Sequence, residues 1–275
     1  MDLVKIIEDA VSYPFSDWKK ILILGILAII SSLGIATLFI GTLLGIKNVL
    51  VIILLFIIGY FIFGFLIDGY NFRIIKASIS GELELPEFNN WVEMFVDGIK
   101  VSIVFLVYII PAILIIAFAG LSVLSTLESF VSNPSSIDLN IILSVLSATL
   151  LVLIAILYII IILPINFMAI AHMANNNSKL RTAFRFHDII DKIGKIGWGN
   201  LIIWYIVTGT IYILITIIGS IITAIFSILN PIVGIVISSL IVSPYLYMYL
   251  NRSIALFYLS EYKYHFNYLL HLFLS

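Results

Sequence analysis

The sequence predicts an all-α integral membrane protein with six transmembrane helices and both termini in the cytoplasm. The chain of 275 residues is 63% apolar and only 11% charged, whereas soluble domains average about 25% charged residues. Its mean hydropathy is +1.23. Six long runs contain no charged residue, and the Lys and Arg residues collect in every second connection between them. A bilayer explains this pattern, because a soluble globule would leave much of that apolar surface in water.

Each of the six runs is long enough to cross the bilayer, since a helix of about 20 apolar residues spans its hydrocarbon core. Polar or turn-forming residues separate the members of each pair: Gly45 to Asn48, Glu128 to Asp138, and Asn230-Pro231. We therefore predict three hairpins, with spans over residues 21–44, 49–67, 101–127, 139–165, 201–229 and 232–250.

The positive charges predict the orientation. Thirteen of the 14 Lys and Arg residues lie in the N-terminal segment, the connections after the second and fourth spans, and the C-terminal tail. Among the alternate connections only Lys47 is basic. Because connections rich in Lys and Arg stay in the cytoplasm, we expect both termini and both long connections on the cytoplasmic side of the cell membrane.

Four amphipathic segments are predicted to form interfacial helices, over residues 2–12, 86–100, 179–196 and 261–274. The second of these carries one apolar stripe at helical spacing, made of Phe88, Trp91, Val92, Phe95, Val96 and Ile99. The opposite face carries Asn89, Asn90, Glu93 and Asp97. The segment is too short to span, so we expect the stripe to be buried among lipid head groups or under the bundle. Aromatic residues favour the membrane interface, and those predicted to lie there are Trp18, Phe88, Trp91, Phe95 and Trp198.

Similar features recur three times along the chain. Asp17, Asp97 and Asp191 each stand before an odd-numbered span, and a segment beginning at Gly69, Pro164 or Pro244 follows or closes each even one. We interpret the chain as a single membrane domain of three pseudo-repeats, each an interfacial helix followed by a transmembrane hairpin. Unrelated hairpins between charged connections would give a similar pattern.

Several motifs resemble an uncharacterised family of archaeal multi-pass membrane proteins, known only as a domain of unknown function. The motifs are Tyr13-Pro14-Phe15-Ser16-Asp17-Trp18-Lys19-Lys20, Gly69-Tyr70-Asn71-Phe72-Arg73 and Leu85-Pro86-Glu87-Phe88-Asn89-Asn90-Trp91. The resemblance implies an archaeal cytoplasmic membrane and no assigned activity. The repeated architecture is also similar to the membrane portion attached to some glycerophosphodiester phosphodiesterases.

The residues give little sign of chemistry. The predicted spans hold no Asp, Glu, Lys, Arg or His, the usual marks of proton relays and intramembrane catalysis. The chain has no Cys, and its net charge of −1 provides no basic field for nucleic acid. His187 with Asp188 and Asp191 is the nearest approach to a metal or acid–base group, and the solvated face of a helix explains it better. We expect no catalytic residue, metal or cofactor, and the ligand-binding residues stay unknown.

The sequence supports three hypotheses about function. A core without charges and amphipathic helices on one face favour a non-enzymatic protein that handles a lipid-like solute, permease-like or lipid-organising. The alternative is a structural or regulatory membrane subunit packed against a partner, because no site chemistry is visible. An enzyme with a site on the cytosolic face has the least support. Membrane lipid is the expected partner, and a protein partner or a homo-oligomer is left open.

The predicted topology can be tested by labelling single cysteines, because the chain has none of its own. A cysteine at Asn89 should react with a membrane-impermeant reagent only after the cells are opened. A cysteine at Ser135, in the connection predicted to be outside, should react in intact cells and serves as the control. Labelling of the Asn89 variant in intact cells would contradict the topology.

Overall fold

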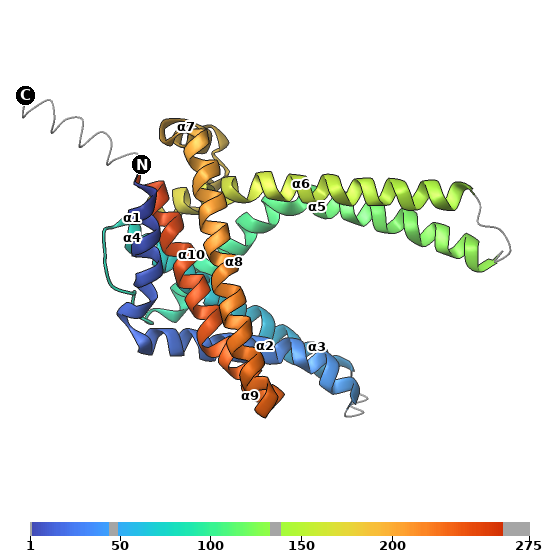
Figure 1. The fold of residues 1–275 in the computed structure, drawn as a ribbon, viewed down its shortest axis with the longest axis horizontal. Helices are drawn as coiled ribbons and strands as arrows, with labels where there is room; N and C mark the ends of the chain where they lie inside the picture. The colour runs from blue at the N-terminus through green and yellow to red at the C-terminus, as the bar shows by residue number, and fades with distance from the viewer. Residues whose placement is uncertain (1, 44–48, 133–138, 261–275) are drawn as a thin grey trace, which may run out of the picture. The chain divides into compact units, whose positions relative to one another are not determined.

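The computed structural model describes residues 2–43, 49–132 and 139–260, and within these ranges the regular structure is entirely helical (Figure 1). The first half contains α1 (Leu3–Ser12), η1 (Tyr13–Ser16), α2 (Trp18–Leu43), α3 (Val49–Phe56), η2 (Ile57–Ile62), α4 (Phe63–Ile79) and α5 (Trp91–Ser132). The second half contains α6 (Leu139–Asn175), η3 (Leu180–Phe184), α7 (Phe186–Ile196), α8 (Trp198–Leu229), α9 (Pro231–Ile237), η4 (Ser238–Val242) and α10 (Ser243–Tyr258).

In the part of the chain that the structure describes, five helical segments are long and apolar enough to cross a membrane: Leu50–Ile79, Trp91–Leu124, Ile141–Asn175, Trp198–Leu229 and Pro231–Tyr258. They overlap the last five predicted spans. The first predicted span, 21–44, coincides with helix α2 up to Leu43, and residue 44 lies outside the described residues. Large apolar side chains stay exposed along these helices, for example Leu150, Ile213 and Ile228. A bilayer is the solvent in which such a surface is stable.

The helices differ from the predicted elements mainly at their polar ends. The second, fourth and sixth spans run on helically to Ile79, Asn175 and Tyr258, where the predictions stopped at 67, 165 and 250. No proline follows those positions within these helices, and the glycine that does, Gly69, packs within α4 against the Met94 backbone, so each helix continues past the end of its apolar run.

The predicted interfacial helices have four different outcomes. Helix α1, Leu3–Ser12, forms within the range predicted over 2–12, and its interfacial position stays a prediction. The prediction over 86–100 is wrong as a separate element, because α5 begins at Trp91 and continues into the span without a break. The segment 179–196 divides into η3 and α7 at Arg185, whose backbone is not helical. The helix predicted over 261–274 lies outside the described residues.

The chain forms two compact units. Unit 1, the larger, comprises Met1–Ser102 and Met168–Ser275, and unit 2 comprises Ile103–Phe167. The smaller unit is a hairpin of α5 and α6, which run side by side (Figure 1). Four of its buried side chains are alanines, Ala112, Ala119, Ala148 and Ala155. The Tyr158 hydroxyl donates to the Tyr108 carbonyl at 2.9 Å. Small residues let two membrane helices approach closely, so dispersion contacts and polar bonds hold the hairpin.

The larger unit has a dense core at its charged end. Tyr70, Ile21, Leu24, Met94 and Met248 belong to one buried cluster. Trp204 of α8 stacks on Phe257 of α10 with ring centroids 4.5 Å apart, and its indole N–H donates to the Ser253 hydroxyl. The apolar core and the polar bonds of unit 1 thus meet at the end where its charged residues collect.

Residues 80–90, which we call the strap, cross this charged end without regular structure. Leu85 is buried in the apolar cluster and holds the middle of the strap against the core. Side chains from four elements donate to its carbonyls: Arg252 to Glu82 (2.8 Å), Tyr13 to Glu84 (3.0 Å), Lys20 to Leu85 (2.7 Å), Tyr70 to Pro86 (3.0 Å), and Arg73 to Glu87, Asn89 and Asn90. These bonds replace those that a helix or sheet would supply.

Arg252 joins the first and last helices of unit 1. Only 2% exposed, it donates from Nε to Asp9 Oδ1 at 2.7 Å and from Nη2 to Asp9 Oδ2 at 3.2 Å. Its guanidinium lies 4.5 Å from the Tyr13 ring centroid. Burial raises the pKa of Tyr13 to about 12, against the opposing effect of Arg252, so the Tyr13 hydroxyl stays a donor to the strap even in alkaline solution.

Two glycines set the distance between α4 and the first turns of α5. A Cβ added at Gly69 would lie 1.8 Å from the Met94 carbonyl oxygen, and one at Gly98 would lie 1.8 Å from that of Phe65. These obstacles are backbone atoms, which cannot rotate away, so a side chain at either position would push the two helices apart.

We expect Gly98→Ala to destabilise the protein by about 1–3 kcal/mol or more, the cost of overpacking a tight contact. Gly120→Ala is the matched control in the same helix, because nothing lies within 4 Å of its added Cβ. That change should be neutral or stabilising, since Ala exceeds Gly in helix propensity by about 1 kcal/mol. Thermal unfolding in detergent measures both. Equal melting temperatures for the two variants would contradict the close helix contact.

Candidate functional site

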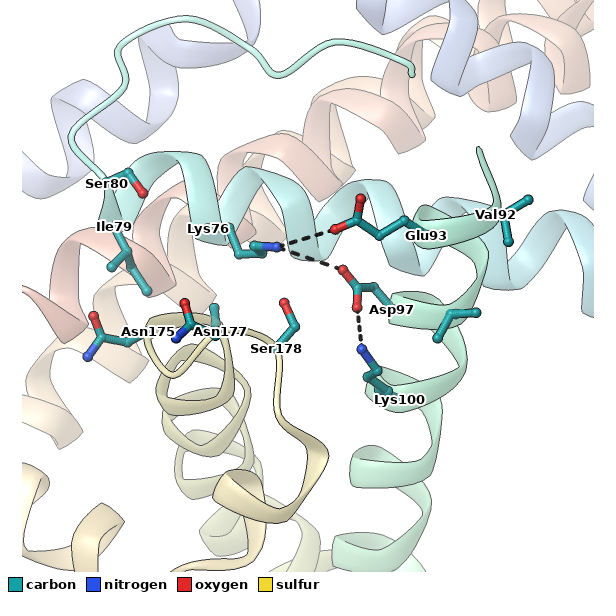
Figure 2. A pocket seen from close by; sticks show the side chains of 12 residues that line it. Lys76, Ile79, Ser80, Val92, Glu93, Asp97, Lys100, Asn175, Asn177 and Ser178 are labelled. Atoms are coloured by element: carbon teal, nitrogen blue, oxygen red, sulfur yellow. Dashed lines mark hydrogen bonds and ion pairs between the residues drawn. The ribbon is translucent and has the colours of Figure 1, made fainter. Parts of the chain in front are cut away.

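A pocket of about 590 Å³ opens at the charged end of unit 1 (Figure 2). The last turn of α4, the first turns of α5, the end of α6 and the turn that follows it form its walls. Its lining mixes charged, polar and apolar side chains: Lys76, Ile79, Ser80, Val92, Glu93, Val96, Asp97, Lys100, Ala174, Asn175, Asn177 and Ser178. The volume lies within the range of small-molecule sites, about 300–1,000 Å³.

Asp97 is the buried acid of the pocket, with 1% exposure. Its Oδ1 accepts a hydrogen bond from Lys100 Nζ at 2.7 Å. Its Oδ2 is also buried and has no hydrogen-bond partner among the described residues. The sequence placed Asp97 on the polar, exposed face of an interfacial helix, and that expectation is wrong. The close contact of Gly69 and Gly98 with the backbone of the facing helix turns this side of α5 inward.

Lys76 faces the same carboxylate from α4. Its Nζ lies 4.0 Å from Asp97 Oδ2 and 3.9 Å from Glu93 Oε1. Both distances exceed those of a hydrogen bond, about 2.7–3.2 Å. Figure 2 shows the ammonium pointing from α4 toward both acids, which lie on α5. Lys76 is therefore attracted to both acids without a close contact to either.

The turn after α6 presents Ser178 to the pocket. Asn177 and Ser178 both have φ of 56°, a left-handed conformation that costs energy in residues other than glycine. The Ser178 amide donates to the Met173 carbonyl at 3.1 Å and so fixes the turn. The hydroxyl is buried and has no partner among the described residues. Left-handed residues are common where a helix ends, so the unused hydroxyl, rather than the turn itself, is the distinctive feature of Ser178.

Valine side chains of α5 supply part of the apolar lining of the pocket. Val92 is 79% exposed and Val96 43% exposed. Both belong to the apolar stripe that the sequence predicts to be buried in the interface. The stripe is divided in the structure: Phe88 stacks on Tyr70 at 3.8 Å and Phe95 packs edge-on against Phe65, whereas Trp91, Val92 and Val96 face outward.

The other predicted interface residues lie at helix starts. Trp18 begins α2 and Trp198 begins α8, and both are about half exposed. Outward aromatic side chains at these positions are compatible with a membrane interface, and that role stays a prediction for all five aromatic residues. The pocket brings none of the five into its lining.

Histidine contributes a weaker candidate. His187 Nε2 lies 3.5 Å from Asp191 Oδ2, both exposed on α7. His172 Nδ1 lies 2.9 Å from the Tyr258 hydroxyl. In the described ranges no group of three or more His, Asp or Glu side chains could hold a metal. The pocket at Asp97 is therefore the candidate site that the geometry favours.

Sequence reasoning did not find the pocket. Lys76, Asp97 and Ser178 are far apart in the chain, and each had a simpler reading as a residue of a solvated connection. One signal was present: Asp97-Gly98-Ile99-Lys100 repeats the spacing of Asp17-Trp18-Lys19-Lys20, and both Asp–Lys pairs form ion pairs in the structure.

Five helices able to cross a membrane, with a charged pocket at one end, define the chain as an α-helical membrane protein. Residues 51–224 match the family described as protein of unknown function, DUF4013. That match covers more than half of the chain, and the protein belongs to this family. The resemblance to an uncharacterised family is confirmed to that extent. No curated protein and no solved structure matches the chain.

The two lysines of the pocket should differ in their effect on stability. Lys100→Met removes the only donor to Asp97 Oδ1 that the structure describes, and leaving such a buried acid unpaired costs about 1.5–3 kcal/mol. Lys76→Met removes only the two long contacts and should cost less than about 1 kcal/mol. Thermal unfolding of the two matched variants in the same detergent measures the difference. A larger loss for Lys76→Met would contradict the assigned pairing.

Proposed function

We propose that this protein is a non-enzymatic, multi-pass protein of the cytoplasmic membrane that binds a lipid-like amphiphile in the pocket at Asp97, in a permease-like or lipid-organising role. One observation supports this above all: charged and apolar side chains line a single cavity. Lys76, Asp97 and Lys100 supply the charges, and the outward-facing Val92 and Val96 of α5 supply apolar surface next to them. An amphiphile needs both surfaces at once.

The proposed topology places this pocket at the membrane surface. Six spans with both termini in the cytoplasm would bring the charged end of unit 1 to the inner head-group region, because the Lys and Arg residues collect there. The exposed Trp91 next to Val92 supports this depth, since tryptophan favours the interface. A lipid in the inner leaflet could then reach the pocket without leaving the bilayer.

The internal repeat also belongs to this proposal. Asp17 and Asp97 each precede or begin a long helix and each pair with the Lys three residues later, at 3.5 and 2.7 Å. The third unit has Asp191 in α7, followed by Gly197 and the long helix α8. These parallels support three pseudo-repeated hairpins, of which the second contributes the acid of the pocket.

Lipids that stay bound through purification test the function. Native mass spectrometry of the protein from mild detergent should detect a bound amphiphile at a stoichiometry near one. Val92→Ser with Val96→Ser should reduce its occupancy severalfold, because each substitution removes apolar contact worth about 1 kcal/mol or more.

Val131→Ser is the matched control, an exposed valine near the far end of the same helix that does not line the pocket. It should leave the occupancy unchanged. An equal loss in the control and the double variant would contradict a specific site. A stoichiometric protein partner instead of a bound amphiphile would favour the rival function, a structural or regulatory subunit.

A further inference from the structure

We infer that the charged side of the pocket recognises an uncharged, polyhydroxylated head group, a sugar or polyol, with one hydroxyl placed between Lys76 and Asp97 and another near Ser178. This inference rests on the proposed function and specifies the chemistry of its ligand. It follows from the polar atoms that the protein leaves unused, from the charge balance of the pocket and from its size.

The unused atoms include both donors and acceptors. Asp97 Oδ2 is a buried acceptor without a hydrogen bond, and the Ser178 hydroxyl is buried and without a partner in the described chain. Lys76 Nζ has its two acidic neighbours at 3.9 and 4.0 Å, too far for it to donate to either. Buried polar groups are usually satisfied, and an unsatisfied one is explained by a ligand, a water molecule, an ion or strain; the Lys76 ammonium is partly exposed and free to meet a ligand from the cavity. The three groups line one cavity and face one another across it (Figure 2).

The separation of Lys76 and Asp97 suits a hydroxyl group. A hydroxyl oxygen between them can accept from the Lys76 ammonium while its hydrogen is donated to Asp97 Oδ2. An ammonium could only donate, and an unprotonated phosphate oxygen could only accept. One hydroxyl group therefore satisfies both Lys76 and Asp97. A second hydroxyl on the same ring or chain would form a hydrogen bond with Ser178 on the opposite wall.

The charge balance disfavours an anionic head. Lys76 and Lys100 are offset by Glu93 and Asp97, so the charged side chains lining the pocket sum to zero. A phosphate close enough to bind Lys76 would also lie close to the buried Asp97 carboxylate, and like charges repel strongly where water is excluded. An uncharged head meets no such repulsion, and the cavity of about 590 Å³ has room for several hydroxyl groups at once.

The test compares three probes on protein purified in a polyoxyethylene detergent, whose head carries no sugar to compete for the site. The probes are a galactosyl diacylglycerol, methyl galactoside and a phosphatidic acid with the same acyl chains. We expect the galactolipid to bind at least about tenfold more tightly than phosphatidic acid, a difference of about 1.4 kcal/mol. Methyl galactoside should bind weakly, because it lacks the apolar chains that would contact Val92 and Val96.

Ser178→Ala is the discriminating variant. It keeps the Cβ and the left-handed backbone, and it removes a hydroxyl that no described residue uses. The melting temperature without ligand should therefore stay equal or rise, while the affinity for the galactolipid falls about threefold to tenfold, the value of one hydrogen bond. Lys76→Met should weaken binding at least as much. Ser147→Ala, an exposed serine that bonds only within its own helix, should change neither quantity.

The outcomes separate the inference from the proposed function. Tighter binding of phosphatidic acid would overturn the hydroxyl head group and leave the amphiphile site standing. Binding of neither lipid would overturn both. If methyl galactoside bound as tightly as the galactolipid, the head-group chemistry would hold and the ligand would be a free sugar, which contradicts the lipid function. Unchanged affinity in Ser178→Ala and Lys76→Met would overturn the placement of the head group.

Discussion

The strap of residues 80–90 has to satisfy its backbone carbonyls without a helix or a sheet, and much of the charged end is organised by that requirement. Arg252, Tyr13, Lys20, Tyr70 and Arg73 donate to seven of its carbonyl groups, counting all three bonds of Arg73. The donors come from η1, α2, α4 and α10, so the strap connects elements from both ends of the sequence. It also ends where α5 starts, at Trp91, and so fixes the position of Asp97 two turns later.

The cations of this protein thus have two kinds of role. The bias of Lys and Arg toward alternate connections is a signal of topology in membrane proteins, and here several of those same residues are used inside the fold. Arg252 and Lys20 are buried, and Lys100 neutralises the buried Asp97. A buried cation is stable only when its donors are satisfied, and carbonyls of an irregular segment supply many acceptors in a small space. Positive charge at this end therefore serves packing as well as any role in orientation.

The sequence predicted the helices well and their ends poorly. Long uncharged runs indicate membrane helices because each residue of such a run favours the same environment. The position of a helix end, as at Ile79 and Asn175, depends on the turn residues that follow it, which hydropathy does not report. The segment 86–100 has apolar residues at helical spacing, yet its residues 86–90 belong to the strap. They stay non-helical because Arg73 binds the carbonyls of Asn89 and Asn90. That contact is long-range, and so is the pairing of Lys76, Asp97 and Ser178 around the pocket, so periodicity in one segment could predict neither.

The bond between Arg252 and Asp9 spans 243 residues of chain, and this has a consequence for biosynthesis. A ribosome adds about 5–20 residues per second, so Asp9 emerges roughly 12–50 s before its partner. During that interval Asp9 and the Glu82 carbonyl lack the Arg252 guanidinium, whereas Arg73 can already bind the other end of the strap. Closure of the charged end by Arg252 is then a late event, and a nascent chain stalled before α10 lacks these bonds.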